Sequence, residues 1–156
     1  MAATKRSASI RYLPPTAFPE LPTPVEHELL TRKCLIPQYP RTWKATDRIN
    51  VIRGEFAKAG QKDWAVLCST PADISLLLFW NASDKGLAEV ALDATDAYLI
   101  GGSVPKETLV EKYADHLQGI VPDHDAVGIT SADNRTVVRY FHQGKWIQLG
   151  GGGPSR

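Results

Sequence analysis

The side chains best suited to acid–base or metal chemistry are concentrated around one histidine. Asp123, His124 and Asp125 are consecutive, His116 precedes them, and His142 follows in a later segment. Neutral imidazoles and carboxylates are common zinc ligands and common general bases. These five residues form a candidate polar site, and their convergence in one cleft would make the protein a small metal-dependent hydrolase.

The spacing of these residues also supports a simpler interpretation. Neighbouring side chains of an extended segment point to opposite sides, so Asp123 and His124 are not expected to converge. Asp123 and Asp125 fit equally well as Asx turns or caps in a loop. No G-x-S-x-G motif is present, and the glycine pair at 101–102 lacks the spacing of a phosphate-binding loop. The sequence therefore predicts no metal site and no cofactor, and favours a protein that is not an enzyme.

Four tryptophans offer flat apolar surfaces for a ligand or for the core. Trp64 and Trp80 lie in continuous apolar runs, which favours core packing. Trp43 lies in a loop that contains proline, and Trp146 follows a turn, so these two are the candidate ligand contacts. Both fit equally well as covers over the core.

Two cysteines, Cys34 and Cys68, are present without the C-x-x-C spacing of zinc ribbons or redox sites. A disulfide between them would join the end of a helix to a core strand and stabilise the fold by roughly 3–4 kcal/mol. The alternative is two buried thiols that pack as small apolar side chains. The disulfide requires an oxidising compartment.

Two helices are predicted to lie beside the strands that carry these residues. Thr23, Pro24 and Glu26 have the types preferred at a cap and first turn, which predicts a helix from 24 to about 33. Pro105 is a suitable first residue for a second helix, and the residues after it form an apolar stripe at helical spacing. This pattern predicts a helix near 105–117.

Apolar runs predict strands in most of the remaining chain. The first turns between them are short, which suits antiparallel neighbours. Continuous apolar runs at 64–67 and 76–80 predict strands covered on both faces. The expected fold class is α+β, a mainly antiparallel sheet with an N-terminal helix and a second helix near 105–117. The predicted strands are 49–56, 64–68, 74–80, 87–92, 97–100, 127–130, 136–142 and 146–149.

Composition sets further limits. The chain has 156 residues, of which 43% are hydrophobic and 22% charged, with a formal net charge of +1. This composition is typical of one globular domain, and the balanced charge argues against a nucleic-acid partner. No apolar stretch approaches the roughly 20 residues of a membrane helix, and no leader is visible. We expect a flexible arm at 1–17, one domain at 18–149 and a flexible glycine-rich tail at 150–156.

Several sequence blocks, taken together, carry a family resemblance. They are FPELP at 18–22, RKCLIPQ at 32–38, NVIRGEF at 50–56, DWAVLCS at 63–69, VPKE at 104–107, DHDA at 123–126 and VVRYFHQGKW at 137–146. The combination resembles a family of uncharacterised exported bacterial proteins and covers most of 18–149. The resemblance implies that Cys34 and Cys68 are paired and that the protein acts outside the cytoplasm. It implies no activity.

One block also resembles a single repeat of integrin-type propellers, the FG-GAP repeat. Gly54-Glu55-Phe56 and the DWAV run at 63–66 match the frame of that repeat. The loop between them has Ala57, Ala59 and Gln61 where calcium would need alternating acidic oxygens. This resemblance therefore implies a strand–turn–strand unit and no calcium site.

These observations favour an exported, non-catalytic binding or structural module, located in the periplasm or secreted. Its expected partner is an unknown protein or small ligand, with no nucleic acid and no membrane span. The alternatives are the metal-dependent hydrolase built on His116, Asp123, His124, Asp125 and His142, an immunity or inhibitor protein, and a cytoplasmic location.

Overall fold

The computed structural model describes residues 10–38, 48–92, 98–131 and 135–149. Within these ranges, ten strands form three antiparallel sheets, and two α-helices and two short 3-10 helices accompany them. The chain is therefore α+β with mostly antiparallel sheets, as predicted. No helix in the described ranges is long and apolar enough to cross a membrane.

The first large sheet is an antiparallel meander in which consecutive strands are neighbours, in the order β3-β4-β5-β6. Its strands are β3 (Val51–Gly54), β4 (Asp63–Ser69), β5 (Ile74–Phe79) and β6 (Ala88–Leu92). The 3-10 helix η2 (Trp80–Ala82) follows β5 directly. The strands β4 and β5 lie in the middle of this sheet and are almost entirely buried, in agreement with their continuous apolar runs.

The second large sheet has the order β10-β9-β8-β7. Its strands are β7 (Tyr98–Val104), β8 (Ala126–Ser131), β9 (Thr136–His142) and β10 (Lys145–Leu149). The hairpin between β9 and β10 turns at Gln143 and Gly144, which both have positive φ, and this matches the predicted turn.

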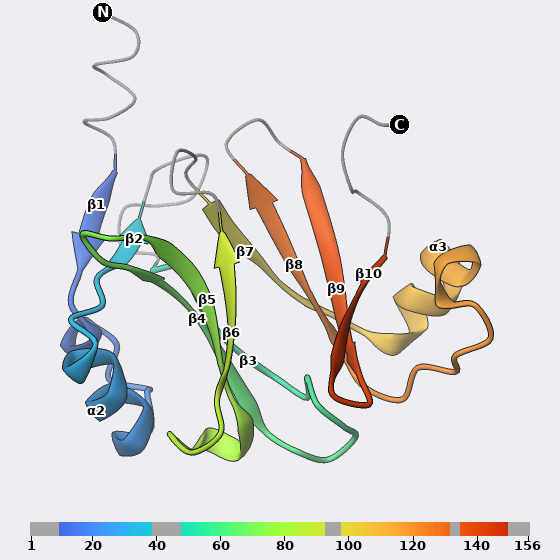
Figure 1. Ribbon diagram of the computed structural model, residues 1–156, viewed down its shortest axis with the longest axis horizontal. Coiled ribbons are helices and arrows are strands. Elements are labelled where there is room, and N and C mark those ends of the chain that lie inside the picture. Colours follow the sequence, from blue (N-terminus) through green and yellow to red (C-terminus); the bar gives the residue numbers. More distant parts are fainter. Residues whose placement is uncertain (1–9, 39–47, 93–97, 132–134, 150–156) are drawn as a thin grey trace, which may run out of the picture.

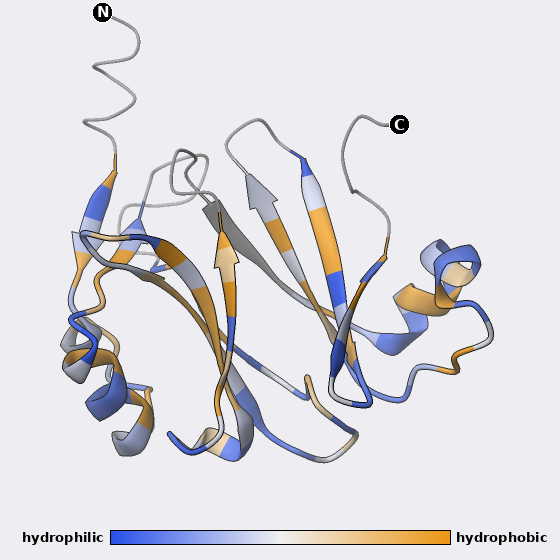
Figure 2. Ribbon diagram, in the orientation of Figure 1, coloured by the Kyte–Doolittle hydropathy of each residue, from blue (hydrophilic) through white to orange (hydrophobic). Residues whose placement is uncertain are grey.

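The two large sheets and the two helices form four layers (Figure 1). Helix α2 (Thr23–Thr31) covers the outer face of the first sheet, where its Val25 and Leu29 pack against Val66 and Leu77. Helix α3 (Lys106–Leu117) covers the outer face of the second sheet. The sheets face each other between these helices, so both are covered on two sides. Figure 2 shows hydrophobic residues along the strands of both sheets and hydrophilic residues at many of the turns.

A small third sheet precedes the large ones. It pairs β1 (Arg11–Leu13) with β2 (Ile36–Gln38), and the 3-10 helix η1 (Pro15–Ala17) lies between β1 and α2. A disulfide joins Cys34, just after α2, to Cys68 on β4, with the two Cα atoms 5.1 Å apart. An isolated bridge between Leu35 and Ser69 continues this connection. Helix α2 is thus attached to β4, a central strand of the first sheet.

The sequence predicted one sheet, whereas the large strands divide between two. The division falls between β6 and β7, because β7 pairs with β8 and not with β6. The apolar pattern of a strand shows which faces are buried, and it does not show whether the neighbouring layer is a helix or a second sheet. The helices span Thr23–Thr31 and Lys106–Leu117, against predicted ranges of 24–33 and 105–117.

Candidate functional site

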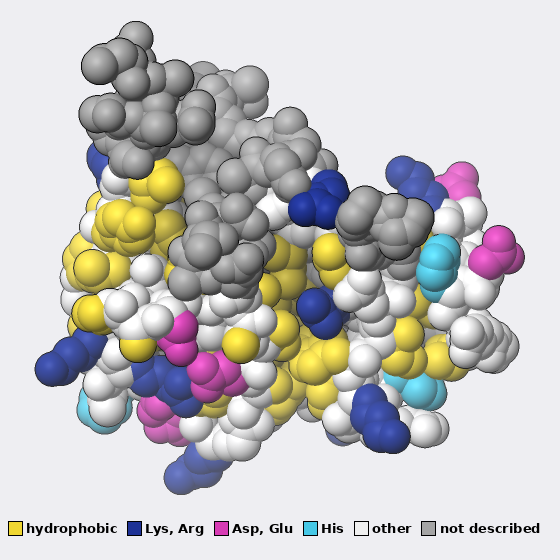
Figure 3. Space-filling view, turned by 45° about the horizontal axis from the view of Figure 1, so that its top comes forward, with side chains coloured by type: hydrophobic (Ala, Val, Ile, Leu, Met, Phe, Trp, Pro, Cys, Tyr) yellow, Lys and Arg dark blue, Asp and Glu magenta, His cyan; other side chains and the backbone are white. Residues whose placement is uncertain are grey.

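The two large sheets pack through an apolar interface that is closed at its centre. Ala65, Leu67, Leu76 and Val127 point into it from the central strands and are buried. Side chains near the outermost strands β6 and β10 are only half-buried, and no further strand of the described ranges lies beyond these two. We call this half-buried part the open side; it comprises Trp80, Ala88, Val90, Leu92, Phe141 and Trp146. Figure 3 shows hydrophobic side chains gathered in the hollow between the two halves of the molecule.

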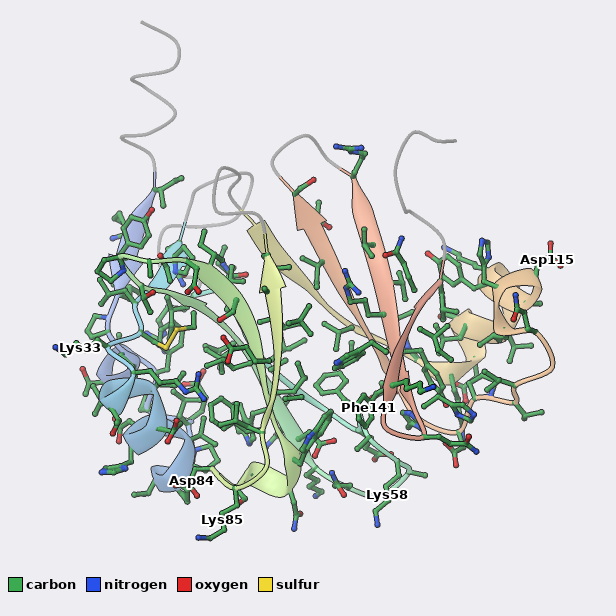
Figure 4. The ribbon with its side chains drawn as sticks, viewed as in Figure 1. Lys33, Lys58, Asp84, Lys85, Asp115 and Phe141 are labelled. Atoms are coloured by element: carbon green, nitrogen blue, oxygen red, sulfur yellow. A yellow bond between two sulfur atoms is a disulfide. The ribbon has the colours of Figure 1, made fainter. Side chains whose placement is uncertain are left out.

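Three aromatic rings close one end of the open side. The ring of Trp80 lies 4.8 Å from that of Phe141 and 6.4 Å from that of Trp146, and the latter two rings are 5.0 Å apart. Phe141 and Trp146 are cross-strand partners, and Phe141 lies between the sheets (Figure 4). Such ring pairs contribute about 0.5–1.5 kcal/mol beyond their buried area. The cluster therefore joins the end of β5 to the β9–β10 hairpin.

Arg139 shares the face of Phe141 on β9. It is the cross-strand partner of Val127, whose side chain lies in the interface, and directly opposed residues point to the same side. The Arg139 Nε atom is shielded from water and has no hydrogen-bond partner within the described part of the chain. An apolar surface and an unpaired guanidinium thus lie next to each other at the open side.

The histidine at the centre of the predicted polar site is buried behind the second sheet. His124 is 5% exposed, and its ring stacks on Tyr140 at 4.3 Å. Its Nδ1 lies 2.6 Å from Oδ1 of Asp123, and its Nε2 lies 2.7 Å from the carbonyl oxygen of Phe141. The Tyr140 hydroxyl lies 3.1 Å from Nδ1 and accepts a hydrogen bond from the Asp123 amide.

These contacts engage both nitrogens of the ring. A carbonyl oxygen only accepts, so Nε2 of His124 donates to Phe141. Nδ1 lies within hydrogen-bond distance of both the Asp123 carboxylate and the Tyr140 hydroxyl. A general base needs a ring nitrogen that faces a substrate, and both nitrogens here face the protein.

Two pKa values around His124 depart from their ordinary values. The hydrogen bond from His124 lowers the pKa of the Asp123 carboxyl below its ordinary value of 3.8. Burial raises the pKa of the Tyr140 phenol above its ordinary value of 10.0. Asp123 therefore stays ionised, and Tyr140 stays protonated, at neutral pH.

The other acidic residue of this segment points elsewhere. The Oδ2 atom of Asp125 accepts a hydrogen bond from the Glu55 amide at 3.2 Å, and the Asp125 amide donates to the Glu55 carbonyl oxygen at 2.7 Å. Asp125 thus attaches the 121–125 segment to the end of β3. Asp123 and Asp125 therefore have different roles. The contact between Asp123 and His124 differs from the prediction, because these neighbouring side chains were not expected to converge.

The remaining predicted site residues are dispersed. His142 follows Tyr140 on β9, with its ring 6.3 Å from the tyrosine ring, so three rings are stacked in series. His116 is exposed on α3 and packs against Tyr113 at 6.4 Å. Trp43 lies outside the described residues, and Trp146 belongs to the aromatic cluster. In the described ranges, no three His, Cys, Asp or Glu side chains are arranged to hold a metal ion.

Several residues that carry the site were not singled out from the sequence. Arg139 and Phe141 alternate with Val138 and Tyr140 on β9, a pattern that could have indicated two covered faces. Asp63 was also missed: it is fully buried, and its carboxylate accepts four hydrogen bonds. The donors are the Phe56 amide, the Ala57 amide, the Gln61 side chain and the Asn81 amide, at 2.9, 3.1, 2.7 and 2.7 Å.

No family model, curated protein or solved structure matches this chain.

Proposed function

We propose that the protein is a non-catalytic binding module that acts in an oxidising compartment, in the periplasm or outside the cell. It binds its partner through the open side of the interface between the two large sheets. The observation that carries this proposal is the contiguous half-buried apolar surface formed by β6, η2 and the β9–β10 hairpin.

The disulfide supports the proposed compartment. Disulfides persist in the periplasm and outside cells, whereas cytoplasmic reductants keep most thiols reduced. The bond between Cys34 and Cys68 fixes the position of α2 on the outer face of the first sheet. The open side lies on the opposite face of that sheet, so the helix and the bond leave it uncovered.

The hydrogen bonds of the polar groups support a non-catalytic role. His124 has both ring nitrogens engaged, Asp125 is bonded to the Glu55 backbone, and Asp63 accepts four hydrogen bonds. A hydrolytic site instead needs acidic and basic groups that converge on a reacting atom. These groups stabilise loops and strand ends.

A contiguous apolar surface that remains partly accessible to solvent, as the open side does, commonly marks a site of interaction. Trp80, Phe141 and Trp146 add rigid aromatic rings, which are enriched among the residues that dominate binding energy. The open side is therefore a better candidate than α3, where Val110 is exposed beside charged residues.

A neutral hydrophobic dye tests the proposal without requiring a natural partner. Nile red should show saturable fluorescence enhancement with the oxidised protein. The Val90→Asn variant, with a polar group in the open side, should lose most of the enhancement, whereas Val110→Asn on α3 should retain it. Thermal unfolding of both variants checks that they fold. Absence of enhancement in the wild type, or an equal loss in both variants, would contradict binding at the open side.

A further inference from the structure

We infer that the open side binds an extended peptide segment of a partner protein as an added strand on β6, with a carboxylate of that segment paired to Arg139. This inference rests on the proposed function and specifies the chemical class of the partner. Three features support it: the unprotected edge of β6, the direction of its side chains, and the unpaired guanidinium.

The first feature is the edge of β6. In the described part of the chain, β6 pairs only with β5, and its register from Ala88 to Leu92 is regular, without a bulge. Natural edge strands are usually blunted by lysine, proline, bulges or inward charges, and β6 has none of these. Its single charged residue, Glu89, points to the α2 side and pairs with Arg32 at 3.3 Å. Among the described residues, no strand pairs with the outer backbone groups of β6, so these groups could pair with an added strand.

The second feature is the alternation of side chains on β6. Ala88, Val90 and Leu92 point toward the second sheet and are half-buried, whereas Glu89 and Ala91 are exposed on the other face. A strand added to β6 would alternate in the same way. Its inward side chains would cover Val90 and Leu92 and approach the aromatic cluster. A suitable segment therefore carries apolar residues at alternate positions.

The third feature is Arg139. Its half-buried side chain lies on the face of β9 that is turned toward the first sheet, and its Nε has no hydrogen-bond partner within the described part of the chain. Removing a charged donor from water without a partner is unfavourable, and a carboxylate offers the bidentate geometry that a guanidinium prefers. An acidic side chain, or the carboxylate of a chain end, on the inward face of the segment would satisfy it.

A peptide fits these features better than a free fatty acid does. A fatty acid would supply the carboxylate and the apolar surface, but it has no backbone groups to pair with β6. Strand addition uses the backbone for affinity and the alternate side chains for specificity. The regular edge and the two-residue alternation of the surface both favour the peptide.

The test is selection from a library of random short peptides displayed on phage, against the oxidised protein. Selected peptides should have apolar residues at alternate positions and an acidic residue at one inward position. Selection against Arg139→Gln should lose the acidic preference, and a selected peptide should bind this variant at least about tenfold more weakly than the wild type. Replacing the acidic residue of that peptide with its amide should cause a similar loss, and little further loss in Arg139→Gln.

Two lysine variants of β6 test the position of the added strand. Val90→Lys places a charge on the inward face and should abolish peptide binding, whereas Ala91→Lys on the outer face of the same strand should weaken it much less. Amide shifts in NMR spectra should be largest at β6 in the wild type. Thermal unfolding establishes that the variants fold. The selected peptide whose acidic residue is replaced with its amide tests the charge pairing with the unmodified protein.

Other results would overturn the inference in distinguishable ways. Selection of no peptides, or acidic preference that persists in Arg139→Gln, contradicts it. Binding of dodecanoate that depends on Arg139, without peptide binding, would assign the site to small amphiphiles. After any of these results, the proposed function would still stand if the wild type binds Nile red and Val90→Asn does not. If the wild type does not bind Nile red, both the proposed function and the peptide inference are contradicted.

Discussion

The Nε2 atom of His124 donates a hydrogen bond to the carbonyl oxygen of Phe141 at 2.7 Å. The side chain of the same Phe141 lies on the other face of the sheet, where its ring is 4.8 Å from Trp80. A buried polar network on the α3 side is thereby connected through one residue to the open side of the interface. The network has a structural role in this arrangement, because it holds the end of β9 in place.

Replacement of His124 should therefore affect both faces of the second sheet. His124→Phe leaves the Phe141 carbonyl oxygen without its donor and should lower the free energy of unfolding by about 1–3 kcal/mol. It should also shift tryptophan emission, since Phe141 contacts Trp80 and Trp146. Denaturant unfolding followed by fluorescence measures both effects. The exposed His116→Phe should change stability by less than about 0.5 kcal/mol, and an equal effect of the two variants would contradict the assigned role.

The Asp123–His124 pair should make stability depend on pH in the acid range. The folded pKa of Asp123 is lowered, so its contribution is fully present above its ordinary value of 3.8 and is lost as the pH falls through the folded pKa. The wild type should thus be more stable than Asp123→Asn when the Asp123 carboxylate is ionised. This difference should shrink below about pH 4. Urea unfolding of both proteins across this range is the measurement, and a difference that grows toward acid pH would be inconsistent with the pair.

Asp63 should be among the residues most sensitive to substitution. Asp63→Ala leaves the buried amide of Phe56, and the amides of Ala57 and Asn81, without their acceptor. Each unsatisfied buried donor costs roughly 1–3 kcal/mol, so the loss should be about 3 kcal/mol or more. Asp115→Ala, at an exposed position on α3 that Figure 4 labels, serves as the control and should be nearly neutral. A small effect at Asp63 would show that water replaces the carboxylate.

The disulfide should contribute to stability without forming the binding surface. Cys34→Ser with Cys68→Ser should lower the free energy of unfolding by about 3–4 kcal/mol, from the sequence separation of 34 residues that the bond closes. The intact mass of the wild type should increase by two hydrogens on reduction. A native protein with two titratable thiols would contradict the bond.

Much of the fold follows from local patterns. The continuous apolar runs of β4 and β5 require cover on both faces, and the structure places α2 on one face and the second sheet on the other. The short turns between β3, β4 and β5 predicted an antiparallel meander, and the Gln143–Gly144 turn predicted the last hairpin. The pairing of β7 with β8 across α3 could not be read locally, because it depends on contacts between segments far apart in the chain.

The candidate site was less accessible from the sequence. Asp123 and Asp125 both flank His124 in the sequence, yet one contacts the His124 ring and the other the Glu55 backbone at the end of β3. Trp146 was predicted as a ligand contact, and its ring lies in the cluster at the open side. Arg139 was not singled out, although the apolar residues on both faces of β9 could have indicated that both are covered; the sequence does not show that a second sheet covers the face of Arg139.

The most direct test of the central claim uses light-activated crosslinking in cells that produce the protein. A benzoyl-phenylalanine at position 90 lies on the inward face of β6, and the same residue at position 110 lies on the exposed face of α3. We predict a discrete crosslinked partner at position 90 that is absent at position 110 and is lost when Arg139→Gln is added. Equal crosslinking from both positions, or none from position 90 in a folded and oxidised protein, would contradict binding at the open side.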